Sequence, residues 1–332
     1  MIWTRHAAEA EFALRAASAA AGICRAAEQE ARRSVQRKPD ASPVTVADYA
    51  SQALIGGLLT EAFSHDALVA EEDSRSLAGE AGMAEHILLH LNPLRPDADA
   101  DSVRRWLDHG TQPPGERFWA LDPIDGTKGF LRDEQYVVAL ALIEEGRVMV
   151  AAVAAPRLAP DLRPAASETG CVVVAVRGQG AWIRPLAGGA ERRLAVSNHS
   201  DPVRARLVTS VEQAHTNTAM LARICRRLGV ERAPTPLDSQ AKYLIIAGGQ
   251  ADLLIRLLPQ RQPSYKEKVW DVAAGMLVVE EAGGRVTDLD GRPLDLTAGR
   301  ELTRNRGSLI SNGWLHEPVL AAIQAESAGD EA

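Results

Sequence analysis

The chain opens, over residues 6–34, with hydrophobic residues at the three- and four-residue spacing of a helix. Phe12, Ala16 and Ile23 belong to one apolar stripe, and most charged side chains fall off it. This pattern predicts an amphipathic helix that supports the fold. Thr45 stands directly before a second stretch with the same spacing, where threonine commonly caps a helix. Two helices are therefore expected before the first strand.

Short runs of β-branched and aromatic residues follow and predict strands. The first run, LVA at 68–70, ends in the acidic triplet Glu71-Glu72-Asp73, so this strand would terminate in carboxylates. Later runs lie close together with turn residues between them, which favours an antiparallel sheet. They are FWAL (118–121), YVVALALI (136–143), RVMVAAVA (147–154), CVVVAV (171–176) and AWIRPL (181–186).

Residues 79–117 separate the first run from the others. They contain one helical stretch, AEHILLHL, followed by the Pro- and Asp-rich segment NPLRPDADAD and by PPG at 113–115. Because strands resume directly afterwards, we interpret the Pro- and Asp-rich part as a surface insertion rather than a linker between domains.

After Ser197 the pattern alternates between strands and helices, as in an α/β layer with crossover connections. The predicted class is α/β, with two sheets sandwiched by helices. A boundary near residue 197 would divide an N-terminal α+β domain (1–197) from a C-terminal α/β domain (198–332). In the second half, strands are expected at RLVTS (206–210), ADLLIRLL (251–258), RVTDL (285–289) and SLIS (308–311), and helices near 216–228, 239–248, 268–282 and from Trp314.

Composition and charge exclude some kinds of function for this protein. The 332 residues are 46% hydrophobic and 24% charged, which suits a sizeable core and, at roughly 150 residues per domain, about two domains. The formal net charge of −7 argues against binding a nucleic-acid polymer or an anionic membrane. Cys24, Cys171 and Cys225 form no CxxC pair, so buried, inert thiols are expected. No signal-peptide core or membrane-length apolar run occurs, and the expected location is the cytoplasm.

The densest group of candidate catalytic residues follows the FWAL run. Asp122 and Asp125 stand three residues apart, and in a turn their carboxylates and the Ile124 carbonyl can point at one centre. Hard oxygen donors of this kind suit Mg²⁺, and Gly126 lets the backbone approach a ligand closely. The alternative is that Asp-Pro and Asp-Gly are ordinary turn formers.

Two more carboxylates stand at the ends of predicted elements. Glu71 lies just beyond a strand, and Asp271 lies in the expected first turn of the helix at 268–282, where it can also complement the helix dipole. Together with the pair after FWAL, they would form a site for two or three metal ions if the fold brings them together.

Three strings resemble the signature of the lithium-sensitive, Mg²⁺-dependent phosphatases, the superfamily that contains inositol monophosphatase: VAEED (69–73), LDPIDGTKGF (121–130) and WDVAAGMLVVEEAGGRVTDLDG (270–291). Four more are similar to its 3'(2'),5'-bisphosphate nucleotidase branch: SPVTVADYASQALI (42–55), SVEQAH (210–215), DSQAKY (238–243) and SYKEKVWD (264–271). The resemblance implies an inositol-monophosphatase-like α-β-α-β-α fold, with an antiparallel sheet in the N-terminal half and a mixed sheet in the C-terminal half.

The resemblance also implies Mg²⁺ as the cofactor, with two or three ions, and water activated by Asp48 and Thr127. A threonine hydroxyl bonded to a carboxylate can take a proton from water whose pKa a metal has lowered. Asp48 has a structural alternative, because Thr45-Val46-Ala47-Asp48 fits the acidic variant of a capping box. The implied metal ligands are Glu71, Asp122, the Ile124 carbonyl, Asp125 and Asp271.

The resemblance also implies which residues contact the substrate. Lys242 and Arg256 are the cations expected to bind the phosphate that is not transferred. His215 can equally be an ordinary surface or capping histidine, and Arg256 can be a solvent-facing charge on a strand. The expected substrate-binding residues are Gly126 and Thr127, through their backbone amides, and His215, Ser239, Lys242 and Arg256.

The implied activity is removal of the 3'-phosphate of 3'-phosphoadenosine 5'-phosphate by direct attack of water, giving AMP and phosphate, with lithium sensitivity and a place in sulfur assimilation. The expected partner is a small nucleotide bisphosphate, and the protein is expected to be a monomer or homodimer. An alternative is a phosphatase of inositol or sugar phosphates. A non-catalytic nucleotide-binding protein predicts a broken ligand set, whereas all four carboxylates are present.

Overall fold

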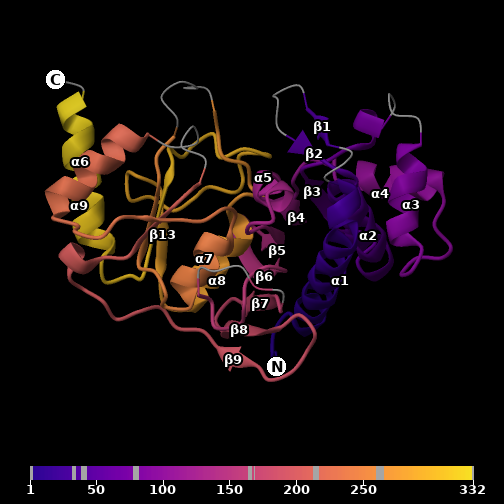
Figure 1. Ribbon diagram of the computed structural model, residues 1–332, viewed down its shortest axis with the longest axis horizontal. Helices are drawn as coiled ribbons and strands as arrows, with labels where there is room; N and C mark the ends of the chain where they lie inside the picture. The colour runs from indigo at the N-terminus through magenta and orange to yellow at the C-terminus, as the bar shows by residue number, and fades with distance from the viewer. Residues whose placement is uncertain are drawn as a thin grey trace.

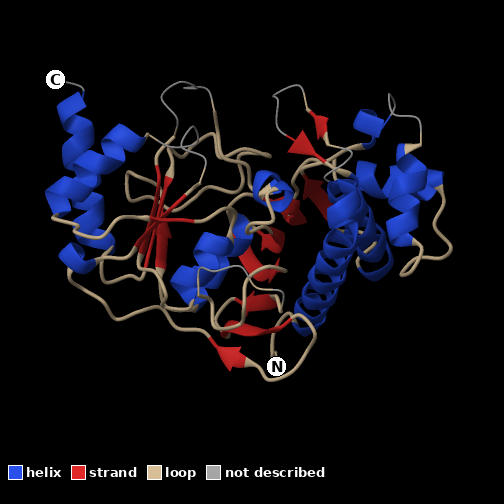
Figure 2. Cartoon of the chain, viewed as in Figure 1, coloured by secondary structure: helices blue, strands red, loops and turns tan. Residues whose placement is uncertain are grey.

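Helices and sheets alternate in five layers in the computed structural model of the protein (Figure 1, Figure 2). The structure describes residues 3–31, 35–38, 43–77, 82–163, 167, 169–211, 217–258 and 265–330. From right to left in Figure 1, the layers are a helical layer, a seven-stranded sheet, a helix pair, a five-stranded sheet and a second helix pair. This order confirms the predicted α-β-α-β-α architecture.

The helices of these layers match most of the predicted ones. The first predicted helix is α1 as far as Ala31, and residues 32–34 lie outside the described part of the chain. The helices are α1 (Ala7–Ala31), α2 (Val46–Ala62), α3 (Met83–Leu91), α4 (Ala100–His109), α5 (Thr127–Leu131), α6 (Thr218–Leu228), α7 (Ala241–Ala247), α8 (Ala273–Glu281) and α9 (His316–Asp330), with 3₁₀ turns η1 (Ser74–Leu77) and η2 (Pro202–Arg204).

The seven-stranded sheet is antiparallel except at one edge. Its first two strands run parallel to each other, and each later strand is antiparallel to its neighbour. In order across the sheet, the strands are β3 (Ala67–Ala70), β4 (Arg117–Asp125), β5 (Val137–Glu144), β6 (Arg147–Ala155), β7 (Cys171–Val176), β8 (Gly180–Pro185) and β9 (Arg192–Arg193).

The five-stranded sheet is mixed, as expected. β10 runs parallel to both β11 and β12, whereas β14 is antiparallel to β12 and β13. In order, the strands are β11 (Thr235–Pro236), β10 (Leu207–Thr209), β12 (Leu253–Arg256), β14 (Ser308–Ser311) and β13 (Arg285–Thr287). A separate two-stranded ribbon is formed by β1 (Gln36–Arg37) and β2 (Pro43–Val44).

Alternate residues of β4 bury their side chains in different cores. Trp119 and Leu121 pack with α1 and α2 on one side of the sheet, and Phe118 and Ala120 pack with α7 and α8 on the other. Burial on both faces explains why the predicted strands are nearly continuous hydrophobic runs. A third core lies between the five-stranded sheet and the α6–α9 pair. The domain boundary near residue 197 remains a prediction.

The Pro- and Asp-rich insertion contains a helix, α4, that the sequence analysis did not predict. Asp99 caps it, because its Oδ1 accepts a hydrogen bond from Ser102 N at 2.7 Å. α4 packs closely on α2, where a Cβ added to Gly56 would lie 2.4 Å from the carbonyl oxygen of Trp106. Part of the segment is therefore packed on the N-terminal core, and interpreting all of it as a surface insertion was wrong.

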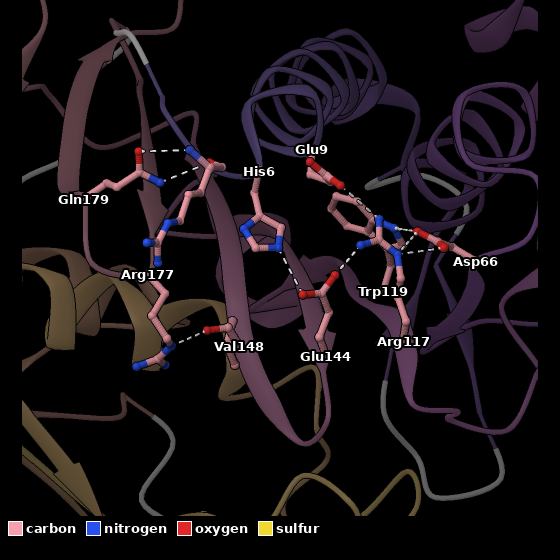
Figure 3. A network of polar contacts seen from close by, with 10 residues as sticks. His6, Glu9, Asp66, Arg117, Trp119, Glu144, Val148, Arg177 and Gln179 are labelled. Atoms are coloured by element: carbon pink, nitrogen blue, oxygen red, sulfur yellow. Dashed lines mark hydrogen bonds and ion pairs between the residues drawn. The ribbon is translucent and has the colours of Figure 1, made fainter.

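Charged side chains fix the start of β4 (Figure 3). Arg117 Nε lies 2.9 Å from both carboxylate oxygens of Asp66, and its terminal nitrogens contact Glu144 and, at 3.2 Å, Glu9. Asp66 also accepts a hydrogen bond from Trp119 Nε1 at 2.9 Å. This network holds the beginning of the strand whose other end carries Asp122.

The cysteines are free, and Cys24 and Cys171 are buried as expected, whereas Cys225 is half-buried. Burial raises the pKa of the Cys171 thiol to about 12. Among the helices of the described residues, none has the length and apolar character needed to cross a membrane.

Candidate active site

The end of β4 brings two aspartates to one face of the strand. Asp122 pairs with Ala139 of β5, and Asp125 pairs with Val137, so three steps along β4 match two steps along β5. One extra residue reverses the normal alternation of side chains, so Asp122 and Asp125 face the same side although they stand three residues apart. This bulge, which contains Pro123, is the local reason why the motif can form one site.

Asp122 is buried and feels the charges of the other acidic residues of the site. Its side chain is 2% exposed, and its Oδ1 makes no hydrogen bond within the described part of the chain. Burial raises the pKa of Asp122 well above its ordinary value, and the negative charges of Glu71, Asp125 and Asp271 raise it further. The four carboxylates that the sequence analysis singled out therefore act on one another electrostatically.

Asp125 and Asp271 are each held by a backbone amide. Asp125 Oδ2 accepts a hydrogen bond from Gln240 N at 2.6 Å, and Asp271 Oδ2 accepts one from Lys268 N at 3.0 Å. Burial raises the pKa of both carboxyls, that of Asp271 to about 7. Asp271 was expected in the first turn of a helix, but α8 begins at Ala273. It lies in the preceding turn, which its side chain closes by bonding back to Lys268.

Lys38, which the sequence analysis did not identify, contacts the acidic site. It follows β1, and its Nζ lies 2.6 Å from Glu71 Oε1 and 2.6 Å from Glu72 Oε1. Burial raises the pKa of Glu72 well above its ordinary value, and the charge of Glu71 adds to this. Within the described ranges, no three His, Cys, Asp or Glu side chains stand in a ready metal-binding arrangement.

The donor set nevertheless fits a divalent cation in its chemistry. Asp122 offers a buried carboxylate oxygen without a hydrogen-bond partner among the described residues, and its neighbours raise its pKa by repulsion. A cation would relieve both the repulsion and the unpaired oxygen. Carboxylate oxygens with one backbone carbonyl, that of Ile124, are donors that Mg²⁺ prefers.

Asp48 uses its two carboxylate oxygens for different contacts. Oδ2 accepts hydrogen bonds from Thr45 N at 2.8 Å and Thr45 Oγ1 at 2.7 Å, which confirms the capping box at the start of α2. Thr127 Oγ1 lies 3.4 Å from Asp48 Oδ1 and 3.2 Å from the Ile124 carbonyl oxygen. Burial raises the pKa of Asp48 to about 7, and bonds from Thr45 oppose this. The capping and catalytic interpretations are thus compatible.

Gly126 joins β4 to α5 at a position that requires glycine. Its φ is 93°, and an added Cβ would lie 3.0 Å from Ser239 Cβ and 3.2 Å from the Gln135 carbonyl oxygen. α5 begins at the next residue, Thr127, as the phosphate-binding hypothesis requires. Ser239 itself has a left-handed backbone with φ 63°, and its Oγ accepts a hydrogen bond from Ala241 N at 3.2 Å.

The two expected phosphate-binding cations both have protein partners. Lys242 is 2% exposed and its Nζ donates to the Leu237 carbonyl at 3.1 Å. Burial lowers the pKa of Lys242 to about 8, against the opposing attraction of Asp125. Arg256 Nε lies 2.5 Å from Oε1 of the buried Glu267, so Arg256 is not merely a solvent-facing charge. Their phosphate contacts remain predictions, and His215 lies outside the described residues.

Gln240 is a site residue that sequence reasoning missed. It is 1% exposed, and besides its backbone bond to Asp125 its Nε2 donates to the Trp270 carbonyl at 3.0 Å. Its Oε1 accepts from Gly275 N at 2.9 Å. Gln240 thus links Asp125 to the turn that carries Asp271. A glutamine inside the DSQAKY string was the available signal, but its partners are distant in sequence.

Comparisons with known proteins show which family this chain is similar to. The profile of the inositol monophosphatase family matches residues 6–328. A rice protein named 3'(2'),5'-bisphosphate nucleotidase is 39% identical over 342 residues, covering 96% of this chain and 94% of that protein. One of the same name from Schizosaccharomyces pombe is 37% identical over 310 residues, covering 88% and 87%.

Solved structures show the same fold. An IMPase from Thermotoga maritima has a TM-score of 0.66 at 19% identity, with 96% of this chain and 98% of that one covered. Mycobacterium tuberculosis SuhB has a TM-score of 0.63 at 21% identity, with 98% of each chain covered. At such identities the likeness concerns the fold alone.

Proposed function

The chain belongs to the inositol monophosphatase family, and we propose that it is a Mg²⁺-dependent 3'(2'),5'-bisphosphate nucleotidase. In this proposal it removes the 3'-phosphate of 3'-phosphoadenosine 5'-phosphate and yields AMP and phosphate. Relatives named for this activity are 35–39% identical over most of the chain. The observation that carries the proposal is the buried carboxylate site at the end of β4, with the Asp122 oxygen that has no hydrogen-bond partner among the described residues.

The metal ligands of the proposal are the residues that the resemblance implies. Mg²⁺, as two or three ions, would neutralise phosphate charge and lower the pKa of the attacking water. The remaining chemistry belongs to Asp48 and Thr127. Thr45 fixes one oxygen of Asp48, so the other stays directed at Thr127 Oγ1, through which the proton of the attacking water can be taken up. The proposed ligands are Glu71, Asp122, the Ile124 carbonyl, Asp125 and Asp271.

The substrate would be held by groups around the start of α5 and by the two cations. The backbone amides of Gly126 and Thr127 suit the scissile phosphate, because amides at a helix start favour anions. Arg256 contacts Glu267 through Nε, and a guanidinium offers five N–H donors, so it can also serve the 5'-phosphate. Besides its burial, the charges of Asp125 and Arg256 shift the pKa of Lys242, Asp125 upward and Arg256 downward, so the three groups act on one another electrostatically. Ser239 and His215 complete the proposed nucleotide contacts.

The direct test compares two substrates under the same set of conditions. Phosphate release from 3'-phosphoadenosine 5'-phosphate and from inositol 1-phosphate would be measured in parallel, with Mg²⁺ titrated and then removed with EDTA. We expect the nucleotide to be preferred and activity to require Mg²⁺. Preference for inositol phosphate would favour the alternative of an inositol or sugar phosphatase, and activity in EDTA would refute the metal assignment. Inhibition by lithium belongs to the same proposal and is tested in the same assay.

A further inference from the structure

Arg300 lies between two backbone segments that lead into proposed metal ligands. Its Nη1 donates to the Gly110 carbonyl at 3.0 Å, and its Nη2 donates to the Ala70 carbonyl. Ala70 is the last residue of β3 and directly precedes Glu71. The Gly110 carbonyl, which follows α4, also accepts a hydrogen bond from Ala70 N at 2.9 Å, so the guanidinium binds both backbone segments that meet at the end of β3.

The other face of Arg300 is turned to the segment before Asp271. Its Cζ lies 4.7 Å from the ring centroid of Trp270, which is 7% exposed and directly precedes Asp271. The backbone of Arg300 is attached to the same segment, since its carbonyl accepts from Val269 N at 3.0 Å. A single side chain therefore connects β3 of the seven-stranded sheet to the turn that precedes α8.

We propose that Arg300 is a positioning residue that holds Glu71 and Asp271 at the separation a divalent cation requires, an inference that rests on the proposed metal-dependent function. Two carboxylates that approach each other without a cation between them repel. Glu71 and Asp271 stand about 200 residues apart in sequence, so contacts between distant segments must hold them together. A planar guanidinium can donate to two carbonyls and stack on an indole at once, whereas an ammonium cannot reproduce this arrangement. Groups that orient metal ligands without touching the metal typically change affinity 10- to 100-fold.

The test measures metal affinity and activity separately. We expect Arg300→Lys to weaken Mg²⁺ or Mn²⁺ binding to the metal-free full-length protein about tenfold, measured by isothermal titration calorimetry. The Mg²⁺ concentration for half-maximal activity should rise by a similar factor, with kcat at saturating Mg²⁺ nearly unchanged. Arg304→Lys is the matched control, because Arg304 is 66% exposed and pairs with Asp295, and it should behave as the wild type.

A merely structural role predicts a different outcome. It would lower the melting temperature of Arg300→Lys in EDTA while leaving the metal affinity of the folded protein unchanged, and that result would overturn the inference. If Arg300→Lys does not fold, Trp270→Phe and Trp270→Leu decide, because only the leucine variant loses the aromatic face and should bind metal more weakly. Equal affinity in those two variants would also overturn it. A wild type that binds no divalent cation would refute the proposed function itself, together with the inference.

Discussion

At the scale of single residues, the acidic site gathers buried carboxylates in excess of the cations that contact them within the described residues. Asp122 is buried with one oxygen unpartnered among the described residues, and Lys38 reaches Glu71 and Glu72 from the β1–β2 ribbon. Burying like charges costs stability unless a cation pairs with them. Residues that reduce stability in the absence of a ligand are typical of functional sites.

Replacing Asp122 by asparagine should therefore separate activity from stability. Asp122→Asn is expected to lower kcat at least about 100-fold, because a charged ligand worth several kcal/mol to the metal site is lost. In EDTA its free energy of unfolding should stay within about 1 kcal/mol of the wild type or increase, because like-charge repulsion is relieved. Phosphate release and urea unfolding measure the two effects. Asp101→Asn, at an exposed position, is the control, and near-normal activity of Asp122→Asn would contradict the assignment.

At the scale of elements, β4 is fixed at both ends by different chemistry. Its start is held by the Arg117 network with Asp66, Glu9 and Glu144, and its end carries the bulge between Asp122 and Asp125. The two ends should respond differently to substitution, because only the second lies at the candidate active site.

Arg117→Met should destabilise the protein without changing its chemistry. Removing the cation leaves three partly buried carboxylates near one another, and we expect a loss of about 2 kcal/mol, less than for a fully buried ion pair. Arg104→Met removes a more exposed arginine and should change stability by less than about 0.5 kcal/mol. Thermal unfolding measures both variants. A kcat of Arg117→Met reduced more than about twofold at a temperature where it is folded would show that the two ends of β4 are coupled.

The junction of α9 with the five-stranded sheet contains a buried histidine that predicts a pH effect. His316 is 0% exposed, its Nδ1 lies 2.8 Å from Ser311 Oγ, and its Nε2 lies 3.0 Å from Thr287 Oγ1. Burial lowers the pKa of His316 to about 4, and the charge of Arg285 lowers it further, against Glu317.

Acid should therefore weaken this junction. The unfolded chain binds a proton near pH 6.5 that the folded chain accepts only near pH 4, so stability falls as the pH drops through that window. The histidine's share of the loss is about 3 kcal/mol at most. Urea unfolding at pH 7 and pH 4.5 would be compared for the wild type and His316→Gln. The difference between the two proteins should shrink at the lower pH, and a constant difference would show that His316 does not titrate in this way.

At the scale of the whole molecule, much of the architecture could be predicted from local patterns. The apolar run that became β4 and the helical spacing after Thr45 identify elements, because each pattern depends on residues that are neighbours in sequence. α4 was missed because it lies in a segment with prolines on both sides and many aspartates, although it packs closely on Gly56 of α2. In the site, the carboxylates could be predicted from their motifs, whereas the contacts of Lys38, Gln240 and Arg300 join residues distant in the chain, and no local pattern encodes such contacts.

The proposed ligands come from two layers, so metal binding should stabilise the whole molecule. Glu71, Asp122 and Asp125 belong to the seven-stranded sheet and its strand ends, whereas Asp271 precedes α8 in the adjoining layer. A cation that binds only the folded state at 100 times its Kd adds about 2.7 kcal/mol to the free energy of unfolding. Differential scanning calorimetry should show a higher melting temperature in Mg²⁺ than in EDTA. Asp101→Asn should keep this shift and Asp122→Asn should lose most of it, because only Asp122 is a proposed ligand. An equal shift in both variants would place the cation elsewhere on the protein.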